Sequence, residues 1–258
     1  QIAQSEIGHI DLAAVETEPF CQWVLEDNFP TGRPPWEFAG AIFTDKVETY
    51  EQMKLTMLNG AHSMLAYTGF LSGHTYVRDV INDASLAILI NRHMAAASQV
   101  VERISGFDVA QYASDLVERF ANTAIAHETY QIAMDGSQKM PQRIFEPALK
   151  AAQMDTDIEP FAFATAMWIR YCSGRHEDGE TYPLRDPLQT KIATALTNCE
   201  TPTEIIRAFE RNLKMLPHQL MSNTRFATKL KTSLEAIYEV GVEKAVKIEA
   251  WGADAANV

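Results

Sequence analysis

The sequence lacks both glycine-rich signatures of nucleotide-binding loops. Neither GxGxxG nor GxxxxGK followed by Ser or Thr occurs anywhere in its 258 residues. The closest pair of glycines, Gly69 and Gly73, has GxxxG spacing, which in a helix more often permits close packing than phosphate binding. The chain therefore shows no nucleotide-binding cradle of its own.

Cysteine and positive charge are also scarce. The three cysteines (Cys21, Cys172 and Cys199) are an odd number without CxxC spacing. This argues against a disulfide framework or a cysteine zinc site and favours a reducing, cytoplasmic compartment. Lys and Arg number 22 against 34 Asp and Glu, a formal net charge of −12. Because phosphate backbones and anionic membranes both repel such a chain, we expect neither nucleic acid nor a membrane as partner.

No targeting segment is evident either. The chain starts with Gln1 and has no basic region followed by an apolar one, so we expect no signal peptide and a numbering that starts inside a longer gene product. The longest stretch without Asp, Glu, Lys or Arg runs over residues 55–77. It carries Asn59, His62 and His74, which favours a buried or active-site helix over a membrane span.

What the sequence does contain is a helical pattern with a hydrophobic share of 47%, ample for a packed core. Residues 20–40 hold three prolines and three aromatic anchors, which predicts an ordered loop region with one short strand, followed by a short edge strand at 41–43. The rest reads as mostly α. The expected helices are 50–70, 76–82, 84–101, 109–120, 123–134, 142–154, 160–171, 187–196, 201–212 and 223–251, the last with a break at Gly241.

Several of these helices carry end signals. Gly106 ends one helix and Asp108 can cap the next. The triplet 135–137 (Asp-Gly-Ser) is expected to close the helix of residues 123–134 in the same way, and residues 176–187 read as a surface excursion. Thr201 and Glu204 form a capping box around Pro202. No internal repeat, low-complexity tract or linker requires a second domain.

One helix face carries candidate chemistry. On an α-helical wheel with Lys54 at zero, His62 falls near 80° and Asn59 near 140°, at about 100° per residue. A lysine among apolar neighbours loses its proton more easily and can act as a general base. An asparagine amide can donate to a developing alkoxide, and a histidine can orient a hydroxyl. Together they suit reversible oxidation of a secondary alcohol.

Plainer interpretations remain open at this point. A lysine at a helix start is usually solvated, and a single Asn or His on such a face is often a core polar group with its own partner. Likewise Lys139 and Arg143, in residues 135–143, are either solvated or fixed donors for a polyhydroxylated or anionic substrate. The other histidines show no HxxxH or HxH pairing, so we expect no metal.

These residues, taken with several further motifs, resemble the polyol-specific long-chain dehydrogenases, the mannitol dehydrogenase family. The spacing Lys54-x4-Asn59-x2-His62 is similar to that family's catalytic signature, and the likeness covers roughly residues 15–195. The further matching motifs lie at residues 18–29, 32–36, 119–122, 135–143, 170–174 and 185–188. As a set they are highly specific.

The resemblance implies the fold and the roles. It implies an all-α C-terminal substrate and catalytic domain, similar to the 6-phosphogluconate dehydrogenase C-terminal-like fold, with the NAD(P)-binding Rossmann half absent from this chain. Residues 1–20 would be an interdomain segment and 21–258 the helical domain. By resemblance Lys54 is the general base, Asn59 one arm of the oxyanion hole, and His62 and Lys139 contact substrate hydroxyls. No metal is needed, NAD (with NADP an alternative) is the cofactor, and the partners are a small sugar acid or polyol and the chain's own Rossmann half.

One position departs from the mannitol type. Gln131, which with Lys139 and Arg143 is expected to bind the substrate, lies eight residues before Lys139 and stands where mannitol-type members often have Arg. The run looks closest to the D-mannonate oxidoreductase (fructuronate reductase) branch, which implies interconversion of D-mannonate and D-fructuronate. The substrate carboxylate would then need a cation elsewhere, with Arg119, Arg143 and Arg170 as candidates. The alternatives are another polyol or hexuronate dehydrogenase, or a helical interaction module without chemistry, for which Lys54 would be solvent-exposed.

Overall fold

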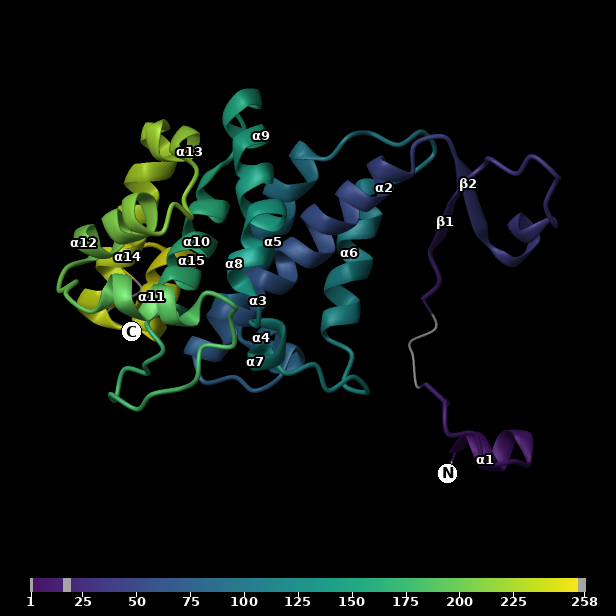
Figure 1. Ribbon diagram of the computed structural model, residues 1–258, viewed down its shortest axis with the longest axis horizontal. Coiled ribbons are helices and arrows are strands. Elements are labelled where there is room, and N and C mark those ends of the chain that lie inside the picture. The colour runs from purple at the N-terminus through teal and green to yellow at the C-terminus, as the bar shows by residue number, and fades with distance from the viewer. Residues whose placement is uncertain (1, 16–19, 255–258) are drawn as a thin grey trace. The chain divides into compact units, whose positions relative to one another are not determined.

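The computed structural model describes residues 2–15 and 20–254, and the chain divides into two compact units, Gln1–Tyr50 and Glu51–Val258 (Figure 1). The first unit contains helix α1 (Ile2–Ile7) and two short parallel strands, β1 (Trp23–Glu26) and β2 (Ala41–Thr44). The predicted edge strand is therefore confirmed. The division into an interdomain segment, 1–20, and a domain, 21–258, stays a prediction.

An aromatic cluster holds the loop between the two strands. The ring of Trp36, in the 3₁₀ turn η1 (Trp36–Ala39), lies 5.5 Å from Trp23, 5.8 Å from Phe29 and 6.4 Å from Phe43, centre to centre. The guanidinium of Arg33 stands 3.3 Å over the Phe43 ring. These contacts confirm the predicted loop pinned by aromatic side chains.

The remaining elements are helical, which confirms the mostly α prediction. In order they are α2 (Val47–Met53), η2 (Lys54–Asn59), α3 (Gly60–Leu71), α4 (Val77–Asn82), α5 (Ala84–Val100), α6 (Val109–Phe120), α7 (Thr129–Ile132), α8 (Gly136–Met140), η3 (Pro141–Phe145), α9 (Glu146–Met154), α10 (Glu159–Tyr171), α11 (Gln189–Leu196), α12 (Pro202–Arg207), η4 (Ala208–Asn212), α13 (His218–Ser222), α14 (Thr224–Val240) and α15 (Val242–Trp251). In Figure 1 the C-terminal helices α11–α15, green to yellow, gather on one side of the helical unit and α6 on the other. No helix within the described residues is long and apolar enough to cross a membrane.

Two helices form the centre of this unit. α10 is buried at every residue from Pro160 to Tyr171, as expected for a helix that is apolar all round, and it packs against α14 and α3. α3 is buried almost throughout and also contacts α4, α5 and α7. Gly69 allows the approach of α4, because a Cβ there would stand 2.3 Å from a methyl of Val80. Gly73 has no such contact and serves a turn with a φ of 84°.

Most of the predicted helix ends are confirmed, but the prediction that Gly106 ends a helix is wrong, because α5 already ends at Val100. The Asp108 carboxylate accepts from the backbone N–H groups of Ala110 and Gln111 at the start of α6. Thr201 and Glu204 form the reciprocal capping box of α12. Gly241, with a φ of 88°, separates α14 from α15. Each of these signals lies within a few residues of its effect, which is why the sequence alone reveals it.

The predicted helix 123–134 is wrong over most of its length. Only α7 is helical there. The Asn122 side chain accepts from the Ala124 backbone N–H, which starts a turn, and Glu128 pairs in extended conformation with Tyr76. Asp135 closes no helix; it adopts a φ of 58° directly before α8. The helix predicted at 142–154 therefore begins earlier, at Gly136.

The helices contain π-helical turns that the sequence pattern did not predict. η2 stands between α2 and α3, and η3 stands between α8 and α9. At the end of η2, the backbone N–H of Gly60 donates to the carbonyl of Leu55, five residues back. Pro141 opens η3. Because proline disrupts the i→i−4 ladder inside an α-helix, the wider turn lets the helical path continue through it.

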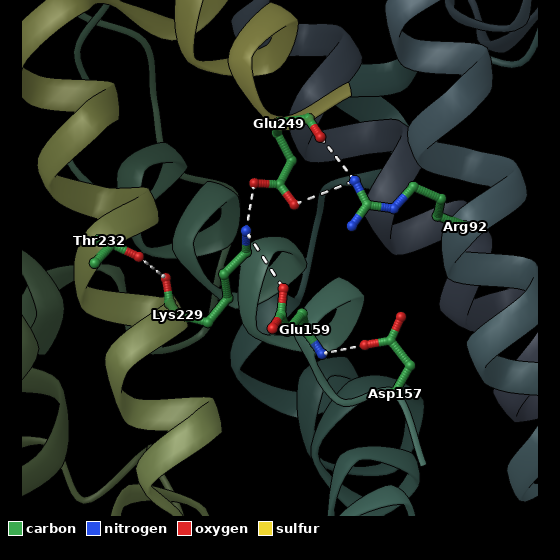
Figure 2. A network of polar contacts seen from close by, with 6 residues as sticks. All are labelled: Arg92, Asp157, Glu159, Lys229, Thr232 and Glu249. Carbon is green, nitrogen blue, oxygen red and sulfur yellow. Dashed lines mark hydrogen bonds and ion pairs between the residues drawn. The ribbon is translucent and has the colours of Figure 1, made fainter. Parts of the chain in front are cut away.

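A charged network fastens the C-terminal helix to the unit (Figure 2). The carboxylate of Glu249 on α15 lies 2.6 Å from the Lys229 ammonium on α14. The backbone carbonyl of Glu249 accepts a hydrogen bond from the Arg92 guanidinium on α5 at 2.7 Å. The Lys229 ammonium also lies 3.8 Å from Glu159 at the start of α10. The network thus joins the four helices α5, α10, α14 and α15 through Glu249 and Lys229.

Candidate active site

The candidate site is built where η2 and η3 meet. Gly60 follows η2 with an ordinary helical φ of −62°, yet a Cβ there would lie 2.9 Å from the Arg143 backbone carbonyl. Only a glycine permits that approach without a shift of the backbone. The absence of one side chain therefore brings the segment of Arg143 against the segment of Asn59.

A short polar chain joins the two segments. The Ser63 hydroxyl donates to the backbone carbonyl of Asn59 at 3.2 Å, and a guanidinium nitrogen of Arg143 reaches the same hydroxyl at 3.5 Å. The Nε of Arg143 is buried without a hydrogen-bond partner among the described residues. Burial lowers the pKa of Arg143. A half-buried guanidinium with unused donor capacity therefore stands beside Asn59.

Lys139 adds a second cation on the same helical path, four residues before Arg143. Its ammonium donates to the Ile132 carbonyl at 3.3 Å. Burial, and next the positive charge of Arg143, lower the pKa of Lys139. Neither cation forms an ion pair with a carboxylate within the part of the chain that the structure describes. Both remain available to an anionic or hydroxylated ligand.

Asp186 fixes the helix that carries Lys139. One of its carboxylate oxygens accepts from the Ser137 backbone N–H at 2.8 Å and the other from the Ser137 hydroxyl at 2.6 Å. The same carboxylate accepts from the Leu188 backbone N–H at 2.8 Å. The motifs 135–143 and 185–188 are thus joined in space. Gly136 allows the start of α8 to approach Trp168 closely, since a Cβ at this position would lie 2.5 Å from the Trp168 indole nitrogen.

His62 lies on α3, half-buried. Its ring centre is 4.8 Å from that of Phe120 at the end of α6 and 6.1 Å from that of His127. Aromatic neighbours on two sides limit the orientations of the imidazole. His127 lies in the loop that the sequence pattern assigned to a helix, so no local signal pointed to it.

Lys54 is exposed, so the expectation of a dry environment for its amine is wrong for this chain by itself. The wheel angle needs correction as well. Hydrogen bonds in a π-helix join residues five apart, so each turn takes more residues than the roughly 3.6 of an α-helix and Asn59 lies less than about 140° from Lys54 around the helix axis. The backbone thus aligns the two residues more closely than α-helical geometry predicts, while the surroundings of the amine remain open to solvent.

The other predicted residues lie in different surroundings. Gln131 is exposed on α7, next to the Ile132 carbonyl that accepts from Lys139. Arg170 is committed elsewhere, because its guanidinium donates to the Ser173 hydroxyl and the Arg175 carbonyl, both at 2.7 Å. Both hydrogen bonds come from one nitrogen of the guanidinium, so the prediction of Arg170 as a carboxylate ligand stays a prediction without support from these contacts. Arg119 lies on α6, in the last turn before Phe120.

Sequence reasoning missed Ser63 and Asp186. Ser63 stands four residues after Asn59, the spacing at which helical neighbours meet, so its position could have suggested the contact. Asp186 bridges a sequence distance of 49 residues, which no local pattern reveals. Among residues 2–15 and 20–254, no three or more His, Cys, Asp or Glu side chains gather closely enough to hold a metal ion.

Comparison with known proteins gives a consistent result. The model of the mannitol dehydrogenase C-terminal domain matches residues 46–238. The chain is 37% identical over 240 residues to the Escherichia coli protein named uncharacterized oxidoreductase YeiQ, covering 93% of this chain and 49% of that protein. It is 40% identical over 188 residues to the D-mannonate oxidoreductase of Escherichia coli, covering 71% of this chain and 38% of that enzyme.

A solved structure agrees in fold. The Pseudomonas fluorescens mannitol 2-dehydrogenase, in a ternary complex with NAD and D-mannitol, superposes with a TM-score of 0.79 at 30% identity. The match covers 89% of this chain and 46% of that one. The chain spans about half the length of the first curated relatives it matches.

Proposed function

Because this chain belongs to the mannitol dehydrogenase family and matches its C-terminal domain, we propose that it is the substrate-binding and catalytic half of an NAD-dependent oxidoreductase. The reaction is hydride transfer at a secondary alcohol of a sugar acid, and D-mannonate and D-fructuronate are the substrate pair. The full enzyme would include a nucleotide-binding half beyond this chain, since no glycine fingerprint occurs in it.

One observation supports an acidic substrate above the others. Arg143 and Lys139 are two half-buried cations with no carboxylate partner among the described residues, and both lie on the path that the Gly60 contact brings against Asn59. A sugar carboxylate would supply the missing charge, and charge-assisted hydrogen bonds to it are strong. The exposed Gln131, by contrast, offers no charge.

Each predicted catalytic residue of this chain has one role in the reaction. Lys54 takes the hydroxyl proton, Asn59 donates to the oxygen that becomes the carbonyl, and His62 holds a neighbouring hydroxyl. When bound, NAD accepts the hydride. The exposed amine of Lys54 requires a cover from the nucleotide-binding half, because only a desolvated lysine is neutral near physiological pH.

The test uses the full-length enzyme with D-mannonate, D-altronate, D-mannitol and D-arabinitol, each with NAD and NADP. We expect activity on D-mannonate with NAD. Lys54→Ala should lower kcat by about 10²–10⁴-fold, the usual contribution of a positioned base, and flatten the pH–rate profile. Lys46→Ala, a substitution of another exposed lysine of the same region, is the control. A Lys54→Ala enzyme at full rate would refute the assigned role.

A second comparison separates acid from polyol substrates. Arg143→Gln should raise KM for D-mannonate by about tenfold or more, since it removes a charge-assisted hydrogen bond, and change KM for D-mannitol far less. Equal effects on both would mean that Arg143 is structural. Wild-type activity confined to D-mannitol, the ligand of the Pseudomonas fluorescens complex, would favour the polyol alternative.

A further inference from the structure

A cationic groove lies beside α11, apart from the residues assigned to chemistry. It has a volume of about 830 Å³ and runs between α11 and the path of α12 and η4. That volume falls in the range of roughly 300–1,000 Å³ typical of small-molecule sites. Its apolar lining residues are Leu188, Ala195, Ala208, Leu213 and Met215.

Three cations line the groove from two walls. Lys191 comes from α11, Arg207 from the end of α12 and Arg211 from η4. All three are exposed, and none forms an ion pair within the described part of the chain. The groove therefore carries a local charge opposite in sign to the net charge of −12 of the whole chain.

Among the described residues that line the groove, the one carboxylate is already engaged. Glu204 accepts from the backbone N–H groups of Glu200 and Thr201, at 2.9 and 3.0 Å, as part of the capping box. Those hydrogen bonds lower the pKa of Glu204, so it stays ionised and attracts Arg207 without an ion pair to it. One negative charge against three positive ones leaves the groove with a surplus of positive charge.

We propose that this groove binds a small organic anion: a molecule with one or two phosphate, sulfonate or carboxylate groups on an apolar body. Arg207 ends α12 and Arg211 lies four residues further on in η4, which is a π-helical turn. With more than about 3.6 and fewer than five residues in such a turn, residues four apart lie on the same face, so both guanidinium groups can hold one acidic group. Lys191 approaches it from the opposite wall. The apolar lining contacts the body of the ligand.

Anilinonaphthalene sulfonate is a suitable probe because it joins a sulfonate to an apolar ring system. The 258-residue chain is titrated with it and, in parallel, with phenylnaphthylamine, which lacks the sulfonate. We expect Arg207→Gln with Arg211→Gln to weaken binding of the sulfonate by about tenfold per guanidinium removed. The matched double variant Arg103→Gln with Arg225→Gln, which removes two exposed guanidinium groups outside the groove, should leave it within about twofold.

Cys199 gives a readout at the site itself. It lines the groove, whereas Cys21 is exposed elsewhere in the chain. Saturating sulfonate should slow alkylation of Cys199 and leave that of Cys21 unchanged, as measured by peptide mass spectrometry. No protection of Cys199, equal affinity in both double variants, or equal affinity for the uncharged probe would each overturn the proposal.

Discussion

Gly60→Ala tests the junction on which the candidate site depends. The added Cβ would lie 2.9 Å from the Arg143 carbonyl, where ordinary contact begins at 3.4 Å, so one backbone must retreat by about 0.5 Å (3.4 − 2.9). Such overpacking costs about 1–3 kcal/mol, while the better helix propensity of alanine returns up to about 1 kcal/mol. The φ of −62° adds no strain. Because the atom that must move is backbone, the upper part of that cost applies, about 2–3 kcal/mol, and the net expectation is a loss of about 1–2 kcal/mol.

The assay is thermal unfolding of the chain, followed by circular dichroism. At about 2–4 °C per kcal/mol for a chain of this size, the midpoint should fall by roughly 2–8 °C. Ala95→Gly, at an exposed position inside α5, calibrates the propensity effect alone. A Gly60→Ala chain that melts at or above the wild-type temperature would show that the two segments yield freely, and the geometry argued for Asn59 and Arg143 would lose its basis.

Further predictions concern the charged network, acid stability and Gly136. Glu249→Gln should destabilise the chain by about 1–3 kcal/mol, because the Glu249 side chain is 10% exposed and Lys229 loses its nearest partner (Figure 2). This magnitude lies between the contributions of exposed and of fully buried ion pairs. A double-mutant cycle with Lys229→Met that shows no coupling would contradict this. His93 is wholly buried, and burial lowers its pKa from 6.5 to about 4, partly offset by the Pro160 backbone. Since the unfolded chain binds the proton first, stability should fall as the pH drops from about 6.5 to about 4, by up to about 3 kcal/mol, and His93→Gln should lose this part of the acid sensitivity in urea titrations at several pH values. Gly136→Ala should lower the melting temperature, because its Cβ would meet Trp168 and Tyr67, and an unchanged value would mean that those rings move aside.

Local signals explain which parts of this fold could be predicted. Asp108 and the capping box at Thr201 act on backbone groups within three residues, so their effect is visible in the sequence. The turn after Asn122 was missed because helix-compatible residues there pair with Tyr76 through Glu128, a contact that depends on the tertiary fold.

In the candidate site, too, features set by nearby residues could be predicted and features set by distant contacts could not. The sequence placed Lys54, Asn59 and His62 on one helix, but it did not reveal the π turn that changes their relative angle. Nor did it reveal that Arg143 would lie against Ser63, since that contact depends on a close approach at Gly60. The solvation of Lys54 could not be read from its neighbours, because burial depends on what else covers the face.

The paired π turns carry a consequence for how such a site can change over time. A π turn holds one residue more than an α turn, so each of η2 and η3 can be viewed as a one-codon insertion absorbed by local widening. The helices downstream keep their register, which leaves the wholly packed α10 undisturbed. Removing a single residue from Lys54–Asn59 would return the turn to α geometry and keep α2 and α3 in register, so the change would fall on the relative placement of Lys54 and Asn59 alone.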